Sequence, residues 1–455
     1  VTTLRNDSRV KGVEIPPEFR DDIFIEHRAT QTGNFTKTTS DSGDFLNWGL
    51  IRHKSKTNNY GGSSSTSEDY TYTLDGSNVD IVIQDSGLEF AHSEFKGTDG
   101  VERTVTIDWY SLSGVTGTQN ANHNRDLDGH GTHCAGIAAG LNYGVAKNAN
   151  VYFVKVRGLE GSTDGATGIA TTDCFDVIKG WHNNKVDNPE TGVPNPTVVN
   201  MSWGYLTTYT NASLTAINYR GVSYTGTDID SSTKREDDFG LNYNIYDGST
   251  YAANLRVLSV DTDVEEMIDA GIHVTIAAGN RGNKCDVPGG PDYNNYYTSN
   301  GTPQYYHRGS SPNADGAILV GNLDSSLNSA TNGDGSNKDQ KATSSECGPA
   351  VDIYAAGSNI MSSTSTTNRF SDSAYFADSN FRQCNISGTS MAAPQVAGLA
   401  ALYLQASPNS TPHALKEAIM GITGDTIYTS SANNDWTDRR SLLGGEQKIM
   451  FNKFT

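Results

Sequence analysis

The sequence predicts an α/β fold with three layers, in which a mostly parallel central sheet carries helices on both faces. Short apolar runs bounded by turn residues alternate with helix-like segments along the 455-residue chain. Two of these runs pass directly into turn motifs, at Asp85 and at Asn280, as strands of an α/β sheet do at their carboxyl ends. The apolar runs predict strands at 79–84, 150–156, 197–201, 272–277, 318–320 and 352–354. The other segments predict helices at 130–140, 173–183, 260–270, 390–406 and 413–420.

The composition argues against two classes of partner. A net charge of −19 disfavours a phosphate-binding surface, so nucleic acid is not an expected partner. No run approaches the roughly 18 apolar residues of a membrane-spanning helix, and we expect none. The first residues lack the apolar core of a signal peptide, and a chain that begins with Val1 rather than Met is expected to have lost an upstream segment.

Five cysteines leave at least one thiol free and allow at most two disulfides. Cys285, Cys347 and Cys384 lie in loop-like sequence and are the candidate members of a bridge. Cys134 and Cys174 lie in helical patterns, where we expect buried thiols. An oxidising compartment therefore stays an open alternative.

Three segments look like additions to a compact body. Residues 1–43 lack a steady periodicity and are expected to form an N-terminal extension or arm, followed by one domain at 44–455. Long polar stretches predict inserts in that domain at about 205–255 and 281–313. The tyrosines of the second insert either line a cleft or, as we favour, cover the body. The serine-rich stretch 61–68 is predicted to be a flexible surface loop.

Ser390 lies in Gly-Thr-Ser-Met-Ala-Ala-Pro, directly before a segment of small apolar residues. A proline lacks an amide donor and is tolerated only near the start of a helix, so Pro394 predicts that Ser390 lies in the first turn or just before it. A hydroxyl there is either a helix cap or a nucleophile. The second interpretation requires a base elsewhere in the chain.

His130 and Asp85 are the candidates for that base and its partner. His130 opens a predicted helix of small residues, and Asp85 ends a predicted strand, where catalytic groups of α/β proteins gather. Each has a structural alternative, as a satisfied histidine and as a turn aspartate. A zinc site at His130, His133 and Cys134 is disfavoured because no further ligand cluster lies near in the sequence.

Asn280 follows a predicted strand in Ala-Ala-Gly-Asn. An asparagine after glycine is common in turns. Beside a serine nucleophile, however, its amide could donate a hydrogen bond to an oxyanion.

Four motifs occur together in this order: Asp-Ser-Gly at Asp85, His-Gly-Thr-His-Cys-Ala-Gly from His130, Ala-Ala-Gly-Asn ending at Asn280, and Gly-Thr-Ser-Met-Ala-Ala-Pro around Ser390. This set resembles the subtilisin-like serine proteases (peptidase S8), and the likeness runs from about residue 47 to about residue 404. Cys134, together with Tyr-Gly-Val-Ala-Lys at 143–147, favours the proteinase K-like branch.

The resemblance implies a role for each of these residues. Asp85 would orient His130, His130 would take the proton of Ser390, and Asn280 would form an oxyanion hole with the Ser390 amide. The substrate would bind as an extended strand. Its binding site would comprise Ser202, Trp203, Gly204, Ala277, Ala278 and Gly279. Trp203 and the insert that follows it depart from the family pattern, so no substrate preference is transferred.

The resemblance also suggests a structural calcium ion. The Asp352 carboxylate and carbonyl groups near Asp315 and Ala317 are the candidate ligands, and oxygen ligands of this kind suit calcium. Asp352 could equally cap a turn. No cofactor is expected for the chemistry itself.

The sequence therefore predicts a serine endopeptidase that acts through an acyl-enzyme, in an extracellular or secreted setting. The alternative is a structural protein, associated with a surface or a virion, that uses the same scaffold with restricted or no proteolysis.

Overall fold

The computed structural model describes residues 29–37, 39–58, 60, 65–159, 167–241, 249–327, 338–429 and 435–455. Its centre is a six-stranded sheet in the order β15-β14-β11-β6-β4-β5, in which all neighbouring strands run parallel. This confirms the predicted sheet. The strands are β4 (Asp80–Asp85), β5 (Asn150–Lys155), β6 (Thr197–Met201), β11 (His273–Ala277), β14 (Ile318–Leu323) and β15 (Ile353–Ala356).

Both faces of the sheet are buried, which is why its strands contain continuous apolar runs, such as Ile81–Ile83 of β4, rather than an alternating pattern. In β4, Ile81 and Ile83 face one core and Val82 faces a second core on the opposite side. Helices α4 (His130–Ala139), α8 (Thr389–Ala406) and α9 (Pro412–Met420) contribute to the first core. Helices α5 (Thr171–Asn183) and α7 (Leu258–Asp269) contribute to the second. The three-layer arrangement and its five main helices are confirmed.

The described part of the expected N-terminal arm belongs to the body. Residues Ala29–Thr36 form β1, which pairs with β2 (Phe45–Asn47) and β3 (Ser65–Tyr72). Phe35 of β1 is fully buried in the first core. Residue 43 is therefore no structural boundary, and residues 1–28 lie outside the described residues. The predicted loop at 61–68 is wrong from residue 65 onward, where β3 begins.

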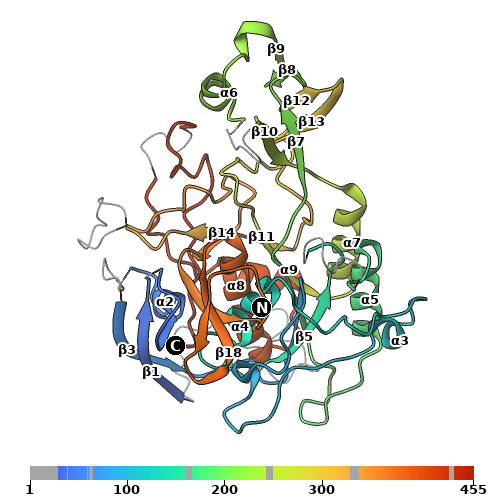
Figure 1. Ribbon diagram of the computed structural model, residues 1–455, viewed down its shortest axis with the longest axis vertical. Helices are drawn as coiled ribbons and strands as arrows, with labels where there is room; N and C mark the ends of the chain where they lie inside the picture. Colours follow the sequence, from blue (N-terminus) through green and yellow to red (C-terminus); the bar gives the residue numbers. More distant parts are fainter. Residues whose placement is uncertain are drawn as a thin grey trace, which may run out of the picture.

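The two inserts form a single subdomain that projects from the body at the top of Figure 1. They meet because β12 pairs with β8, and a four-stranded sheet, β13-β12-β8-β9, results. A second pair joins β10 to β7. The elements are β7 (Leu206–Thr210), β8 (Leu214–Tyr219), β9 (Val222–Tyr224), α6 (Ser232–Phe239), β10 (Thr250–Asn254), β12 (Tyr296–Ser299) and β13 (Thr302–Tyr305).

The subdomain has its own hydrophobic core, which the tyrosines help to fill. Tyr297 and Tyr306 are fully buried there, against Tyr209 and Phe239. The prediction that the tyrosines cover the body is wrong for Tyr297 and Tyr306, because both are buried in this separate small core. Tyr305 stays exposed at the surface.

Shorter elements complete the body, except for η3, which belongs to the subdomain. Among the described helices none is long and apolar enough to cross a membrane. The remaining elements are α2 (Trp48–Arg52), α3 (Trp109–Ser113), the 3-10 turns η2 (Ser93–Phe95) and η3 (Gly226–Asp228), and an antiparallel sheet of β16 (Ile360–Thr364), β17 (Ser373–Tyr375) and β18 (Asp378–Ile386).

All five cysteines are free thiols and all are buried. The Cys285 amide donates to the Cys347 carbonyl at 2.6 Å, so these two residues are neighbours without being bridged. The disulfides considered among Cys285, Cys347 and Cys384 are therefore not formed. Cys134 and Cys174 are buried thiols, as predicted.

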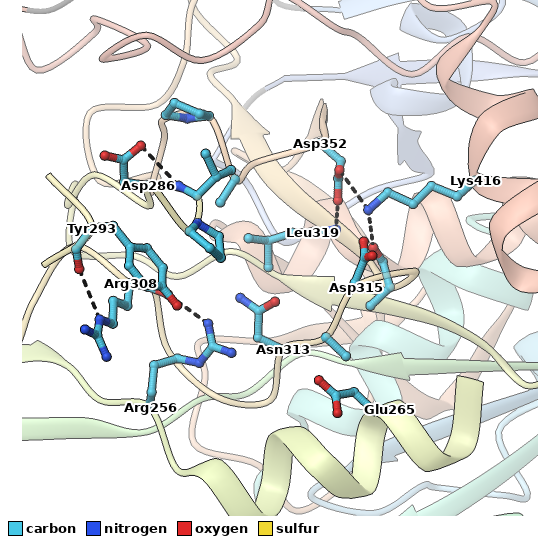
Figure 2. A pocket seen from close by; sticks show the side chains of 16 residues that line it. Arg256, Glu265, Asp286, Tyr293, Arg308, Asn313, Asp315, Leu319, Asp352 and Lys416 are labelled. Atoms are coloured by element: carbon cyan, nitrogen blue, oxygen red, sulfur yellow. Dashed lines mark hydrogen bonds and ion pairs between the residues drawn. The ribbon is translucent and has the colours of Figure 1, made fainter. Parts of the chain in front are cut away.

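Helix α9 lies against the amino ends of β14 and β15, beside a cavity of about 540 Å³. Figure 2 shows Lys416 of α9 reaching to Asp352, which directly precedes β15. This edge of the sheet is opposite to the edge at which Asp85 ends β4.

A buried ion pair ties the N-terminal part of the chain to the body. Arg52 of α2 binds Asp339 in a bidentate manner, with Nε to Oδ1 at 3.0 Å and Nη2 to Oδ2 at 2.7 Å. The Arg52 side chain is 0% exposed and that of Asp339 is 3% exposed. Asn58 also donates to Asp339, so both carboxylate oxygens are satisfied.

We predict that Asp339→Ala lowers the free energy of unfolding by about 3–5 kcal/mol, because the Arg52 charge is left buried without its partner. Urea denaturation measures the loss. The control is Asp230→Ala, which breaks the exposed pair of Asp230 with Lys234 and should cost less than about 1 kcal/mol. Equal small losses in both variants would contradict the assigned role of the buried pair.

Candidate active site

Asp85 and His130 meet at the carboxyl edge of the sheet. Asp85 is the last residue of β4, His130 is the first residue of α4, and His130 Nδ1 lies 2.8 Å from Asp85 Oδ1. Asp85 is 2% exposed, and its Oδ1 also accepts the amide of Ser86 at 2.7 Å. With Nδ1 engaged, Nε2 is the ring nitrogen that remains for a reacting group.

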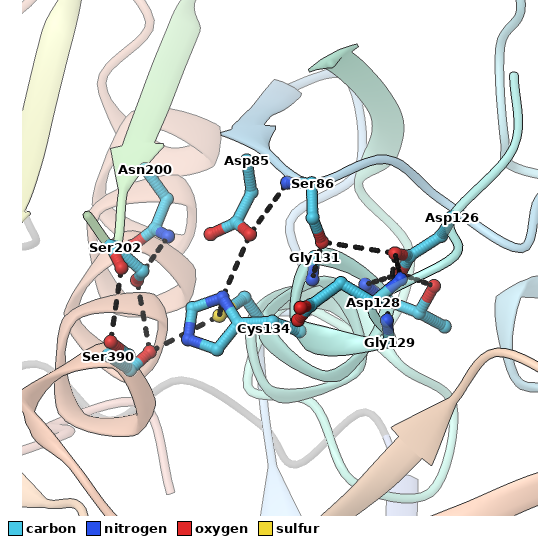
Figure 3. Close-up of polar contacts among 12 residues, drawn as sticks. Asp85, Ser86, Asp126, Asp128, Gly129, Gly131, Cys134, Asn200, Ser202 and Ser390 are labelled. Atoms are coloured by element: carbon cyan, nitrogen blue, oxygen red, sulfur yellow. Dashed lines mark hydrogen bonds and ion pairs between the residues drawn. The ribbon is translucent and has the colours of Figure 1, made fainter. Parts of the chain in front are cut away.

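A network centred on Asp126 holds the start of α4 in place (Figure 3). The helix begins after Gly129, which has no side chain to cap it. Asp126 supplies the cap instead: its Oδ2 accepts the amide and the hydroxyl of Thr132, and its Oδ1 accepts the amide of Gly129. Ser86 donates to Asp126 at 3.0 Å and accepts from the amide of Gly131, which connects this cap to the residue after Asp85.

Burial alone would lower the pKa of His130, but the neighbouring Asp85 carboxylate outweighs it and raises the pKa well above its ordinary value. We attribute the shift to Asp85 rather than to Cys134, because burial raises the pKa of the Cys134 thiol and keeps it neutral. The imidazolium form is thus stabilised by a buried negative charge.

The structure also bears on the zinc alternative. In the described part of the chain, one group of three possible ligands is compact enough to hold a metal, namely Asp85, His130 and Cys134. His133 is not part of it, because it is buried and its Nε2 lies 3.1 Å from the Cys384 carbonyl. Burial lowers the pKa of His133 to about 3, which suits a neutral structural ring.

Ser390 is the second residue of α8, as its distance from Pro394 predicted. In an α-helix the amide four residues later would bond to the Ser390 carbonyl, and Pro394 has no such amide. Two side chains replace it: Ser202 Oγ donates to the Ser390 carbonyl at 3.0 Å, and Cys134 Sγ donates at 3.3 Å. The carbonyl next to the candidate nucleophile is thereby fixed by β6 and by α4.

The Ser390 hydroxyl donates to the Ser202 carbonyl at 3.1 Å. Among the described residues no hydrogen bond joins it to His130. The two residues are nevertheless neighbours, since the Cys134 sulfur that binds the Ser390 carbonyl lies 3.9 Å from His130 Nδ1. Catalytic hydrogen bonds often form only in the substrate complex, and a rotation about χ1 redirects a serine hydroxyl.

Asn280 is oriented by the residue before the candidate nucleophile. Its Oδ1 accepts the amide of Thr389 at 2.8 Å and the Thr389 hydroxyl at 3.1 Å. That hydroxyl itself accepts from the Gly279 amide, so its proton is directed to Asn280. Since both contacts require an acceptor, the exposed Asn280 side chain must turn Nδ2 away from them. Thr389 directly precedes Ser390 in the motif, but nothing in the sequence predicts its contact with Asn280.

A pocket of about 380 Å³ lies between these residues, and its walls differ in part from those predicted. Ala278 does not line it, because successive residues at the end of a strand point to opposite faces and Ala278 is 2% exposed in the second core. The predicted residues that line the pocket are Ser202, Trp203, Gly204, Ala277, Gly279, Asn280 and Ser390, and those that the sequence analysis missed are Leu206, Asn254, Arg281, Ser310 and Thr389.

The missed pocket residues come largely from the inserts. Leu206 and Asn254 face each other across the β7–β10 pair, at the base of the subdomain. Arg281 follows Asn280 directly, and this adjacency was the one signal that could have found it. The inserted subdomain therefore builds part of the pocket wall.

A buried carboxyl group, Glu346, lies behind the pocket. Its Oε1 accepts the amide of Arg281 at 3.2 Å. Gly279 has φ +116°, and a Cβ there would lie 2.7 Å from Glu346 Cγ, so the glycine is required for this close approach. Burial raises the pKa of Glu346 to about 8, which keeps it mostly uncharged at neutral pH and adds no negative charge behind Asn280.

The expected calcium ligands do not fit a calcium ion. Lys416 Nζ lies 2.9 Å from Asp352 Oδ1 and donates to the Ala317 carbonyl at 2.7 Å, so an ammonium group occupies the position between the two. The second carboxylate oxygen of Asp352 accepts the amide of Leu319 at 2.8 Å. No calcium-dependent step is assigned to the site.

Comparison with known proteins agrees with this geometry. The chain is 29% identical over 391 residues to a cuticle-degrading serine protease of Arthrobotrys oligospora, covering 85% of this chain and 64% of that protein. It is 28% identical over 400 residues to the subtilisin-like serine protease Pen c 2 of Penicillium citrinum, covering 85% and 62%. The chain thus spans a little under two thirds of the length of these relatives.

A crystal structure of a cold adapted subtilisin-like serine proteinase has the same fold, with a TM-score of 0.52 at 23% identity, over 91% of this chain and 99% of that one. The model of the subtilase family matches residues 76–435, which include all four motifs. The chain belongs to the subtilase family.

Proposed function

We propose that this chain is a serine endopeptidase that hydrolyses polypeptides through an acyl-enzyme. The observation that carries the proposal is the 2.8 Å contact between His130 and the buried Asp85, at the sheet edge where Ser390 lies in the first turn of α8 beside a pocket. Family membership and the named proteases among the relatives support it. No observation favours the alternative of a scaffold without proteolysis.

In the proposed reaction the Ser390 hydroxyl turns from the Ser202 carbonyl to His130 Nε2. Its oxygen attacks the scissile carbonyl while His130 takes the proton, and Asp85 stabilises the imidazolium that forms. The oxyanion accepts hydrogen bonds from Asn280 Nδ2 and from the Ser390 amide. His130 then gives its proton to the leaving amine, and water releases the acyl group by the same steps.

We further propose that the substrate binds as an extended strand, between the segment after β6 and the segment after β11. The P1 side chain would enter the pocket of about 380 Å³. Trp203 lines this pocket and also packs against Phe175 and Tyr205, which gives the wall a rigid aromatic surface. Arg281 is the one charged residue among the described residues of the lining.

We propose an extracellular setting for this activity. A relative from Thermus, 27% identical over 418 residues, is named an extracellular serine proteinase. The net charge of −19 suits a soluble protein that does not bind nucleic acid.

The direct test of the proposal is covalent labelling with a fluorophosphonate. We predict that the folded protein gains one adduct, located at Ser390 by peptide mass spectrometry, and that it cleaves casein. Ser390→Ala should lose both, whereas Ser387→Ala, which removes a nearby exposed hydroxyl, should keep both. A folded wild type that gains no adduct and cuts no peptide would instead favour a scaffold role.

The pH dependence tests the Asp85–His130 pair. The base form of His130 is required, and ionised Asp85 holds its pKa above the ordinary value, so kcat/KM should rise with pH through this elevated pKa. Asp85→Asn should shift the midpoint to lower pH and reduce kcat by about 10⁴-fold. Asp228→Asn, at an exposed site on η3, should change neither. A wild-type midpoint at or below about 6.5 would contradict the assigned coupling.

Arg281 provides a test of the pocket. Arg281→Glu changes the charge of the pocket wall by two units. The ratio of kcat/KM for a substrate with Lys at P1 to kcat/KM for one with Glu at P1 should therefore rise by about tenfold or more. Arg281→Gln should give a shift of about half that size in free energy. A peptide series that differs only at P1 measures the ratio. A ratio that is the same in all three proteins would show that the P1 side chain does not enter this pocket.

A further inference from the structure

The amino ends of β14 and β15 form a small cradle of oxygen atoms. Ala317 directly precedes β14, and Asp352 directly precedes the neighbouring strand β15. The Leu319 amide donates to Asp352 Oδ2, and the Asp352 amide donates to the Leu319 carbonyl at 3.0 Å, so the carboxylate is fixed against β14. Its other oxygen, Oδ1, and the Ala317 carbonyl are the two acceptors of the cradle.

The cradle holds the ammonium group of Lys416 (Figure 2). Nζ lies 2.9 Å from Asp352 Oδ1 and donates to the Ala317 carbonyl at 2.7 Å. The contacting side chains are about one fifth exposed, 21% for Lys416 and 22% for Asp352, so the pair is sheltered rather than freely solvated. A carboxylate and a backbone carbonyl that converge on one point are a site for a cation.

The same atoms would be ligands for calcium in a chain that lacked Lys416. Calcium takes six to eight oxygen atoms at about 2.3–2.6 Å, from carboxylates, carbonyls and water. An ammonium group needs fewer acceptors, at hydrogen-bonding distance, and brings one charge instead of two. Calcium could enter only by displacing Lys416, since two cations at one carboxylate repel each other.

We propose that Lys416 is an internal substitute for a structural calcium ion, so that this cradle binds no calcium in the native chain. The lysine does more than neutralise Asp352, because it comes from α9. Leu415 and Ile419 of the same helix are buried in the first core, which also contains most of α8. Lys416 therefore fastens α9 to the sheet on the side that carries the Ser390 helix.

The test compares thermal unfolding in about 10 mM calcium with unfolding in a chelator, in a Ser390→Ala background so that self-digestion cannot contribute. In the chelator, Lys416→Met should have a lower Tm than the parent. Calcium should then raise the Tm of Lys416→Met, and this increase should exceed the increase in the parent by about 3 °C or more. Adding Asp352→Asn should remove this excess. Lys234→Met, which removes an exposed lysine paired with Asp230, is the matched control and should respond as the parent does.

Two results would overturn the proposal: a folded Lys416→Met with no excess response to calcium, or a calcium response of the parent that Asp352→Asn abolishes. If Lys416→Met folds only when calcium is present, the proposal is supported. If it folds in neither condition, calorimetric titration of the parent with calcium decides. Binding that depends on Asp352 then refutes the proposal, and the absence of such binding supports it. None of these measurements depends on proteolytic activity.

Discussion

The arrangement of the site depends on one backbone carbonyl, that of Ser390. Pro394 removes the amide that would bond to it inside α8, and Ser202 and Cys134 donate to it instead. These two donors belong to the segment after β6 and to α4, so a single oxygen aligns the proposed nucleophile, the pocket wall and the helix that begins with His130. These contacts require α8 to lie very close to α4 and to the segment after β6. A Cβ at Gly398 would lie 2.6 Å from that of Val145 and 2.7 Å from the Ala138 carbonyl of α4, so this position of α8 requires a glycine.

The charges around the site are arranged so that one carboxylate acts on the imidazole. Asp85 is buried beside His130 and raises its pKa, whereas the Glu346 carboxyl behind the pocket is kept mostly neutral at pH 7 by its own burial. Asp126 is close by in the sequence, but its oxygens are fully used in capping α4. Among the described carboxyl groups near His130, Asp85 is therefore the one that contacts the imidazole directly, while Asp126 caps α4 and Asp128 binds Arg369.

The central sheet could be predicted because its strands are buried on both faces, and each therefore reads as a short apolar run. β1 could not, since its residues Ala-Thr-Gln-Thr-Gly-Asn-Phe-Thr are mostly polar and its partner β3 begins inside the serine-rich stretch 61–68. The subdomain was missed because it depends on pairing between β8 and β12, about 80 residues apart. Thr389 and Lys416 act through contacts with distant residues, which no local pattern reveals. Ala278 could have been excluded from the sequence alone. Successive side chains of a strand point to opposite faces, so a pocket that Ala277 lines is not lined by the side chain of Ala278.

The two edges of the central sheet differ in what they carry: the candidate site and both inserts lie at the carboxyl edge, and the Lys416 contact lies at the amino edge. Both inserts leave the body just after strands, β6 and β11, that are neighbours in the sheet, so both emerge at the carboxyl edge and can pair with each other. Their shared core gives Leu206 and Asn254 a fixed position at the pocket. The residues proposed for the chemistry come from the body, and part of the pocket wall comes from the inserted chain. Under the proposed function, changes in the subdomain would alter the choice of substrate without moving Asp85, His130 or Ser390, while Lys416 contacts Asp352 at the opposite edge.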